Sequence, residues 1–264
     1  MQLSERSFKV VAEVFHRVSG IRLVPAKRQL VIGRLQKLAS ERGLDSLDEY
    51  VDKVIKAGDE TELVKVVDRL TTNETYFFRE PAHFEFLAEL LARRRPGQEF
   101  RVWSAASSSG EEAYSIAMLL ADKIGPKGWK IVGTDLSTAM VEAARKALYP
   151  MERARNTSPQ YLKRFCMKGS GPYEGQLLVS KELRANVHFE QANLMQPLPD
   201  IGQFDVVFLR NVLIYFEPDA KLDIVRRVSP LIKPGGYLFT GHSESLSNLP
   251  TGLTSVKPAV YART

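Results

Sequence analysis

The sequence predicts an α/β domain with a mainly parallel sheet, preceded by a small all-helical domain. Residues 1–70 contain apolar repeats of helical spacing and no alternating strand pattern. From Phe100 onward, short apolar runs alternate with amphipathic stretches, which is typical of a parallel sheet covered by helices on both faces. The stretch 102–112 joins an apolar run, a turn of small residues and a helix start, which is the layout of a βαβ nucleotide site.

The N-terminal region is predicted to form four helices. The first ends near Gly20, a residue suited to a helix C-cap. Pro25 fits the first turn of the second helix, which extends to about Arg42. Ser46 begins the third helix with capping-box spacing, and the fourth covers 59–70. We therefore assign residues 1–72 to a helical domain.

The rest of the chain, residues 73–264, is predicted to form the α/β domain. Its strands are expected at 100–105, 130–134, 187–190, 205–209 and 236–240. Its helices are expected at 81–95, 111–124, 137–147 and 218–232, with a break at Pro96-Gly97. A last short strand over 260–263 is expected to lie antiparallel beside 236–240.

Residues 155–183 interrupt this alternation. They contain Gly169, Gly171 and Gly175, followed by the apolar run 176–179. We predict a small inserted β-subdomain with an open edge strand. A surface loop is the alternative, but long structureless loops are uncommon in compact domains.

Composition limits the class of protein. The 264 residues are 44% hydrophobic, and the single cysteine, Cys166, rules out an internal disulfide framework. No apolar run is long enough to cross a bilayer, so we predict a soluble cytoplasmic protein. The net charge is +6, and six of the basic residues lie between Arg22 and Arg42. Such a patch suits nucleic acid, an anionic membrane or an acidic protein surface, although a solvated helix face explains it equally well.

Four groups of polar residues are expected to converge at the carboxyl ends of the strands, where such sheets bind ligands. The first is the 104–111 turn together with Asp135, an acidic residue placed to accept hydrogen bonds from ribose hydroxyls. The second is Asn193-Leu194, where an amide and a backbone group suit an adenine edge. The third is Arg210-Asn211 with Tyr215, and the fourth is 71–80 at the domain junction. The alternative for the third group is that its side chains only hydrogen-bond backbone groups at the end of a strand. The alternative for the fourth group is a helix N-cap with a packing contact between the domains.

Several other chemistries are disfavoured. The chain has neither G-x-G-x-x-G nor a Walker A motif. The histidines are scattered, so no metal site is predicted: His16, His83, His188 and His242. His242-Ser243-Glu244 resembles part of a hydrolase triad, but no nucleophile elbow accompanies it.

With these residues identified, the chain resembles the CheR family of chemotaxis receptor methyltransferases. The matching blocks are spread over most of the chain in the family's order: 72–80 (TNETYFFRE), 101–107 (RVWSAAS) with 110–112 (GEE), 210–216 (RNVLIYF), and 231–236 (LIKPGG) with 241–244 (GHSE). The resemblance implies a class I S-adenosylmethionine methyltransferase domain with a Rossmann-like sheet. It also implies transfer of methyl to glutamate γ-carboxylates of chemoreceptors, with no metal.

The resemblance also implies roles for individual residues. Arg79 and Tyr215 are the expected catalytic pair near the transferred methyl. The expected cofactor-binding residues are Asn73, Thr75, Arg79, Glu111, Asp135, Asn193, Leu194, Arg210 and Asn211. The expected receptor-docking residues are Lys27, Arg28, Arg34 and Lys37. The glycine loop, with Gly169, Gly171 and Gly175, resembles relatives that bind a receptor C-terminal pentapeptide by strand addition.

Two other functions stay open at this level. A nucleic-acid methyltransferase would also have a basic patch, but enzymes that methylate base amino groups usually have Asp/Asn-Pro-Pro-aromatic where this chain has Arg210-Asn211-Val212-Leu213. A receptor-binding module that uses the cofactor only as a ligand would bind it without turnover. We expect chemoreceptor partners, with no nucleic acid and no membrane insertion.

Overall fold

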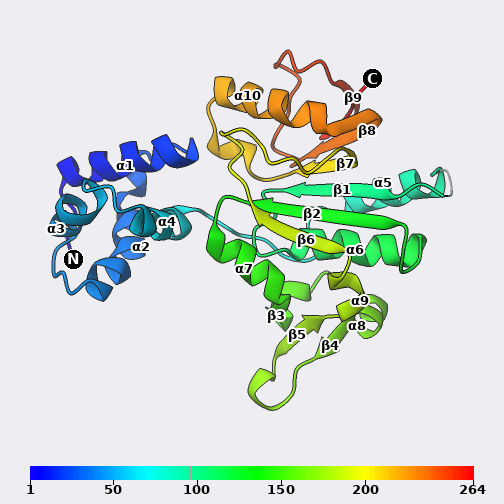
Figure 1. Ribbon diagram of the computed structural model, residues 1–264, viewed down its shortest axis with the longest axis horizontal. Coiled ribbons are helices and arrows are strands. Elements are labelled where there is room, and N and C mark those ends of the chain that lie inside the picture. Colours follow the sequence, from blue (N-terminus) through cyan, green and yellow to red (C-terminus); the bar gives the residue numbers. More distant parts are fainter. Residues whose placement is uncertain (95–96) are drawn as a thin grey trace.

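The computed structural model describes residues 1–94 and 97–264 (Figure 1). The helical domain lies at one end of the molecule, the α/β domain at the other, and a small sheet projects from the α/β domain. The helix predicted over 81–95 is present as α5 (Pro81–Ala92) and ends three residues earlier than predicted, with Arg93 as its C-cap. Arg95 and Pro96, at the predicted end and break, lie outside the described residues.

All four predicted helices of the N-terminal region are present. The Ser4 hydroxyl caps the first helix by accepting from the Ser7 amide, and Gly20 ends it with φ of 73°. The third helix is a short α-helix that continues as the π-helix η2. The elements are α1 (Glu5–Ser19), η1 (Pro25–Lys27), α2 (Arg28–Glu41), α3 (Leu47–Tyr50), η2 (Val51–Ile55) and α4 (Glu60–Leu70). Their apolar faces enclose a core of their own, separate from the two cores of the α/β domain.

The main sheet has seven strands in the order β6-β2-β1-β7-β8-β10-β9. Neighbours from β6 to β8 are parallel, and β10 is antiparallel to β8, as predicted. The edge strand β9 was not predicted. The strands are β1 (Phe100–Ala105), β2 (Trp129–Asp135), β6 (Val187–Gln191), β7 (Phe204–Leu209), β8 (Ile232–Thr240), β9 (Thr254–Lys257) and β10 (Val260–Ala262).

Helices cover both faces of this sheet. Consecutive strand residues such as Val102 and Trp103 belong to different cores, because neighbouring side chains point to opposite faces. One core joins the sheet to α5, α6 (Glu111–Lys123) and α7 (Thr138–Lys146), and the other joins it to α10 (Pro218–Val228). The short helices η5 (Leu213–Tyr215) and η6 (Ser229–Leu231) flank α10.

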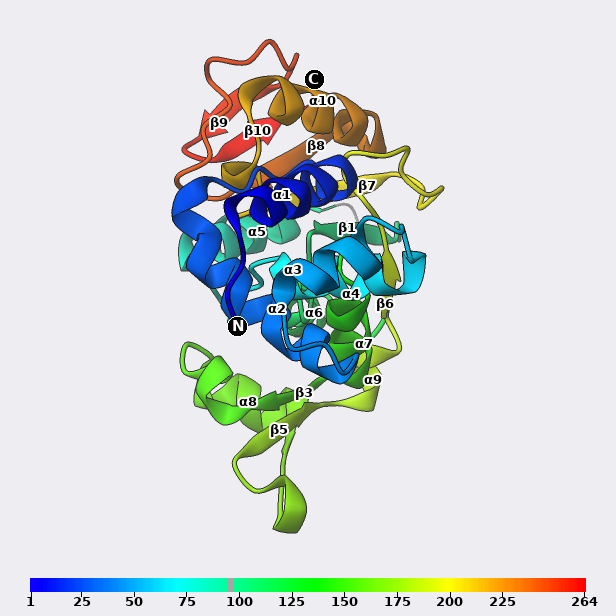
Figure 2. The ribbon, with the colours of Figure 1, turned by 90° about the vertical axis from the view of Figure 1, so that its left-hand side faces the viewer.

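The subdomain that projects at the bottom of Figure 2 is an antiparallel sheet of three strands in the order β3-β5-β4. Two of its strands lie within the predicted insertion, and the third, β3, begins upstream of residue 155. The elements are β3 (Leu148–Pro150), η3 (Met151–Ala154), α8 (Pro159–Phe165), β4 (Cys166–Lys168), η4 (Gly171–Tyr173), β5 (Gln176–Val179) and α9 (Lys181–Arg184). In the residues that the structure describes, no helix has the length and apolarity needed to span a membrane.

Candidate functional site

A cavity lies between the helical domain and the carboxyl ends of the parallel strands. Phe15, Ile21 and Leu70 line it from the helical domain. The structure brings nine of the predicted catalytic and cofactor-binding residues together in its wall: Asn73, Thr75, Arg79, Asp135, Asn193, Leu194, Arg210, Asn211 and Tyr215. Residues more than 100 positions apart in the sequence share this wall, so the cavity exists only in the folded protein.

Asp135, the last residue of β2, is buried at the base of the cavity. Its Oδ2 accepts the Ser108 amide at 2.8 Å, and its Oδ1 accepts the Ser137 amide at 2.9 Å. Burial raises the pKa of this carboxyl to about 6, although both amide bonds act in the opposite direction. Each oxygen has one backbone donor and keeps acceptor capacity for a ligand hydroxyl.

The chain around the cavity contains strained backbone. Five non-glycine residues there have left-handed φ: Phe78 (54°), Glu80 (58°), Ala106 (65°), Ser108 (49°) and Asn211 (56°). Such conformations cost of the order of 1–3 kcal/mol each and persist only where the surrounding structure enforces them. Phe78 and Glu80 flank Arg79, so the surrounding structure holds the segment that places Arg79 at the cavity in one conformation.

Arg210 is the centre of a buried ion-pair network and is 5% exposed. Its guanidinium lies 3.0 Å from Glu112 Oε2 and 3.1 Å from Glu80 Oε2, and it donates to the Arg79 carbonyl at 2.5 Å. Burial raises the pKa of Glu112, whereas Arg210 favours its ionised form. The network joins the 79–80 segment to α6 and to the end of β7, so Arg210 also holds Arg79 in place.

Asn193 and Leu194 connect the cavity to the helical domain. The Asn193 side-chain amide donates to the Val18 carbonyl at 2.7 Å, and its oxygen accepts the Met195 amide at 2.9 Å. The amide therefore joins the two domains, and its nitrogen and its oxygen each already have one partner within the protein. A second link is the hydrogen bond from Thr138 to Asp68, at 2.9 Å.

Arg79 and Tyr215 reach the cavity from segments that follow different elements. The Arg79 guanidinium donates to the Glu74 carbonyl at 2.8 Å. Burial raises the pKa of the Tyr215 hydroxyl, while Arg79 acts on it in the opposite direction. The hydroxyl therefore stays protonated at neutral pH and can donate a hydrogen bond.

Glu244 orders the loop that ends at Tyr215. It is 5% exposed, and it accepts backbone amides from Asn211 at 2.6 Å, Ile214 at 3.1 Å and Gly241 at 2.7 Å. Because one carboxylate closes this turn, the position of Tyr215 depends on a residue about 30 positions later in the chain. Glu244 was not among the predicted site residues.

We expect Glu244→Gln to destabilise the protein by about 1–3 kcal/mol, because an amide group would face one of the three backbone donors. The kcat of the methyl transfer predicted from the sequence should fall more than the affinity for the predicted cofactor, since the damage lies at the Tyr215 loop. Denaturant unfolding and steady-state kinetics would measure both quantities. Glu217→Gln, an exposed change nearby, is the control, and equal stability of the two variants would contradict the role of Glu244.

Glu111 is the predicted cofactor residue that the structure places outside the cavity wall. Its buried carboxylate accepts from the Ser109 hydroxyl at 2.7 Å and lies 3.6 Å from Arg153, and neither of these partners lines the cavity. The next residue, Glu112, lines the cavity and accepts from Ser104 at 2.7 Å. Neighbours in the first turn of a helix point in different directions, and the sequence alone gave no sign of which faces inward.

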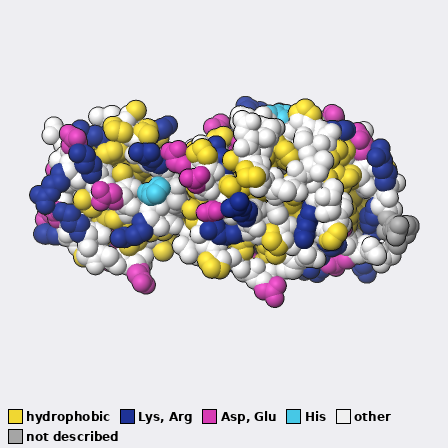
Figure 3. Space-filling view, turned by 90° about the horizontal axis from the view of Figure 1, so that it is seen from above, with side chains coloured by type: hydrophobic (Ala, Val, Ile, Leu, Met, Phe, Trp, Pro, Cys, Tyr) yellow, Lys and Arg dark blue, Asp and Glu magenta, His cyan; other side chains and the backbone are white. Residues whose placement is uncertain are grey.

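The residues predicted to dock a receptor have different environments. Arg34 donates to the carbonyls of Leu70 and Thr71, at 2.8 and 3.0 Å, and so caps the end of α4. Arg28 bonds to the Leu3 carbonyl, and Lys27 lines the cavity. Lys37 is exposed, 3.9 Å from Glu41. Figure 3 shows basic side chains mixed with acidic ones over the helical domain.

The predicted glycine loop joins β4 to β5. A Cβ at Gly169 would lie 2.0 Å from the Tyr173 carbonyl oxygen, and Gly171 and Gly175 have φ of 58° and 78°. Gly169 therefore has no room for a side chain, and Gly171 and Gly175 adopt a conformation that favours glycine. The adjacent edge strand β4 exposes Met167, and the loop exposes Tyr173.

The chain is similar to known protein families and to individual proteins over almost its whole length. The family model described as CheR methyltransferase, all-alpha domain, matches residues 6–71, and the model described as CheR methyltransferase, SAM binding domain, matches residues 73–262. The chain is 42% identical to the chemotaxis protein methyltransferase of Salmonella typhimurium, over 99% of this chain and 91% of that one. It is also 42% identical to the Escherichia coli protein of the same name, over 99% and 92%, and 39% identical to chemotaxis protein methyltransferase 2 of Pseudomonas aeruginosa, over 98% and 93%.

Proposed function

The chain belongs to the CheR methyltransferase family, and from that premise we propose that it methylates glutamate γ-carboxylates of chemoreceptors, forming methyl esters for chemotactic adaptation. The enzyme is an S-adenosylmethionine-dependent methyltransferase. The substrate atom and the residues that act on it are proposals supported by the cavity described above, and we also propose a cytoplasmic location for the enzyme.

The cavity suits the cofactor. Asp135 offers two acceptor oxygens to a pair of ribose hydroxyls, and the apolar side chains of Ile21 and Leu194 are suited to contact a base. When bound, S-adenosylmethionine supplies an electrophilic methyl group on a sulfonium. We assign cofactor contacts to the eight predicted cofactor-binding residues that line the cavity, which are Asn73, Thr75, Arg79, Asp135, Asn193, Leu194, Arg210 and Asn211. Glu112 takes the place of Glu111 in the predicted set, because Glu112 lines the cavity and Glu111 does not.

The observation that best supports a carboxylate substrate is that Arg79 and Tyr215, a cation and a hydroxyl donor, both line the cavity. Among the described residues that line the cavity there is no histidine; its carboxylates are Glu74, Asp135, which accepts two backbone amides, and Glu112, which is held by Arg210 and Ser104. An unperturbed glutamate side chain has a pKa of about 4.3, so it is ionised at neutral pH and needs no base. Arg79 and Tyr215 then act by positioning the carboxylate and excluding water.

The test is transfer of labelled methyl from S-adenosylmethionine to a receptor cytoplasmic fragment, followed by mild base. Label released as methanol is the expected result, because carboxyl methyl esters are base-labile. Stable label would indicate N- or C-methylation and overturn the carboxylate assignment. Cofactor binding with no label on several receptor fragments would favour a non-catalytic binding module.

We expect Tyr215→Phe to lower kcat about tenfold, equivalent to roughly 1.4 kcal/mol of transition-state stabilisation, and to leave cofactor affinity nearly unchanged. The reason is loss of one hydroxyl donor near the reacting groups. Tyr237→Phe, on β8 and outside the cavity lining, is the matched control. Full kcat in the Tyr215 variant would eliminate the positioning role of its hydroxyl.

The basic helix α2 is proposed to meet the acidic methylation helix of a receptor. We expect Lys37→Glu to lower kcat/KM for the receptor about three- to tenfold at low salt, with a smaller effect at high salt because surface charges are screened. Lys53→Glu, an exposed change in η2, is the control. Arg34 is unsuitable for this test because it caps α4. A salt-independent effect of Lys37→Glu would contradict electrostatic docking.

The open edge of β4 is the proposed site for a receptor C-terminal peptide. An extended peptide there would continue the β3-β5-β4 sheet through main-chain hydrogen bonds. The exposed side chains of Met167 and Tyr173 would provide apolar contacts beside it.

A further inference from the structure

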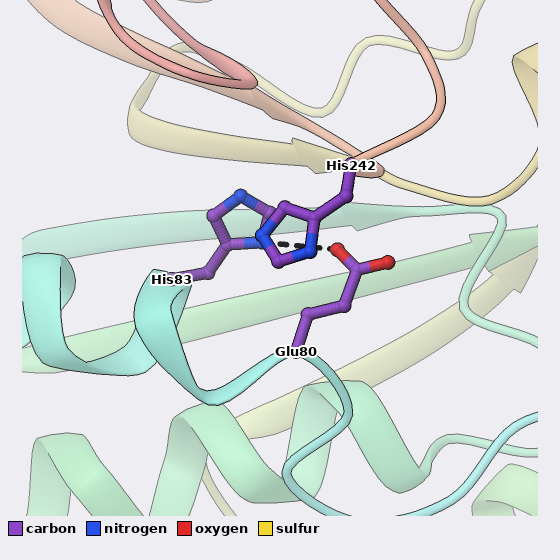
Figure 4. Close-up of side chains that lie close together, drawn as sticks. All are labelled: Glu80, His83 and His242. Carbon is purple, nitrogen blue, oxygen red and sulfur yellow. Dashed lines mark ion pairs between the residues drawn. The ribbon is translucent and has the colours of Figure 1, made fainter.

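Three residues outside the cavity form a cluster of potential metal ligands. Glu80 and His83 lie at the start of α5, and His242 follows β8 (Figure 4). One ligand atom from each lies within 4.8 Å of the other two. The three side chains point toward one another from two elements that are distant in the sequence.

His83 is the unusual member of this cluster. Its side chain is 2% exposed, yet within the described parts of the chain neither ring nitrogen has a hydrogen-bond partner. The nearest acceptor is Glu80 Oε2, 3.4 Å from Nδ1, which is beyond the usual range of about 2.7–3.2 Å. A buried imidazole without partners is costly, so this site favours a ligand that satisfies it.

The spacing suits a metal ion better than a hydrogen bond. Ligands about 2.0–2.2 Å from a tetrahedral Zn²⁺ lie roughly 3.4 Å from one another. The Nδ1–Oε2 distance of 3.4 Å is therefore that of two ligands of one ion. His242 is exposed and can rotate to supply a third ligand, with water as the fourth. We propose that Glu80, His83 and His242 form a binding site for a divalent transition-metal ion such as Zn²⁺.

The chemistry of the three groups supports this class of ion. Two imidazoles and one carboxylate suit Zn²⁺, Co²⁺ or Ni²⁺, whereas Mg²⁺ and Ca²⁺ prefer oxygen ligands. One ring nitrogen of a neutral imidazole carries a proton and the other has the lone pair that binds a metal ion, so each histidine can supply one nitrogen ligand. Asn211 donates to Glu80 Oε1 at 3.1 Å, which is the kind of support that fixes a ligating carboxylate.

The site is adjacent to the cofactor cavity. Arg210 and Asn211 line the cavity on one side and contact Glu80 on the other. An ion on Glu80 Oε2 would compete with Arg210, whose charge also lowers the affinity for the ion. We therefore expect occupation to loosen the Arg210 network and to weaken cofactor binding.

The test is titration of the full chain with Zn²⁺ alone by calorimetry, supported by the visible spectrum of the Co²⁺-loaded protein. We expect one saturable site in the wild-type protein and at least tenfold weaker binding in His242→Ala, whose exposed position makes unfolding no concern. His188→Ala, at another exposed histidine, and Cys166→Ser, which removes the thiol, are matched controls that should bind as the wild type does.

Wild-type zinc affinity in His242→Ala, or loss of binding in either control, would overturn the assignment. So would the absence of a saturable site in the wild-type protein. Saturating Zn²⁺ should weaken S-adenosylhomocysteine binding in the wild type and leave it unchanged in His242→Ala. Unchanged affinity in the wild type would overturn the proposed link to the cavity. None of these readouts requires methyl transfer.

Discussion

Asp135→Asn is expected to weaken S-adenosylmethionine binding by roughly 30- to 150-fold, which corresponds to about 2–3 kcal/mol. The variant keeps the size of the side chain but removes the charge, and it replaces one of the two acceptor oxygens with an amide group. Both oxygens already serve backbone amides, so the variant cannot satisfy these donors and two hydroxyls together. Calorimetric titration with S-adenosylhomocysteine would measure the change.

The same residue predicts a pH dependence of cofactor binding. The pKa of Asp135 is about 6 in the free protein, so the carboxylate that accepts the hydroxyls is lost as pH falls through this value. If only the ionised form binds, affinity falls about tenfold per pH unit below 6 and is flat above it. The Asn variant should lack this dependence. Wild-type affinity in Asp135→Asn, or identical pH profiles for the two proteins, would show that Asp135 does not hold the cofactor.

Arg210→Gln is expected to lower the free energy of unfolding by about 3–5 kcal/mol, because it leaves Glu80 and Glu112 close together without the guanidinium between them. Cofactor affinity should also fall, since the same guanidinium holds the Arg79 backbone at the cavity. Urea unfolding followed by circular dichroism would measure the loss of stability.

The control is an ion pair of similar length at the surface. Lys53 lies 2.6 Å from Glu49, but its side chain is 64% exposed, so Lys53→Gln should change stability by no more than about 0.5 kcal/mol. The double variant Arg210→Met/Glu112→Gln should recover part of the loss, because it removes one of the stranded charges. If Arg210→Gln lowered the free energy of unfolding by less than about 1 kcal/mol, the ion pairs of Arg210 with Glu80 and Glu112 would contribute little to stability.

The sequence alone determined the fold class and most of the individual elements. Helical periodicity, glycine and proline positions and capping residues are local signals, and the four N-terminal helices and the parallel strands appear where they were expected. It also determined the family, because the matching blocks are short contiguous segments. The less regular parts were harder to predict: β9 has four exposed residues, so no alternation marks it, and β3 depends on pairing with β5 for its existence.

Only the tertiary structure decided which predicted residues face the cavity and what each contacts. Glu111 and Glu112 are adjacent, yet one faces Arg153 and the other Arg210. The amide of Asn193 joins the domains, and Glu244 closes the Tyr215 turn. The scattered histidines gave no metal prediction, whereas folding brings His83 and His242 together beside Glu80. The physical reason is common to all these cases: a side chain's direction and its partners depend on contacts between segments far apart in the chain, whereas periodicity reports only neighbours within one element.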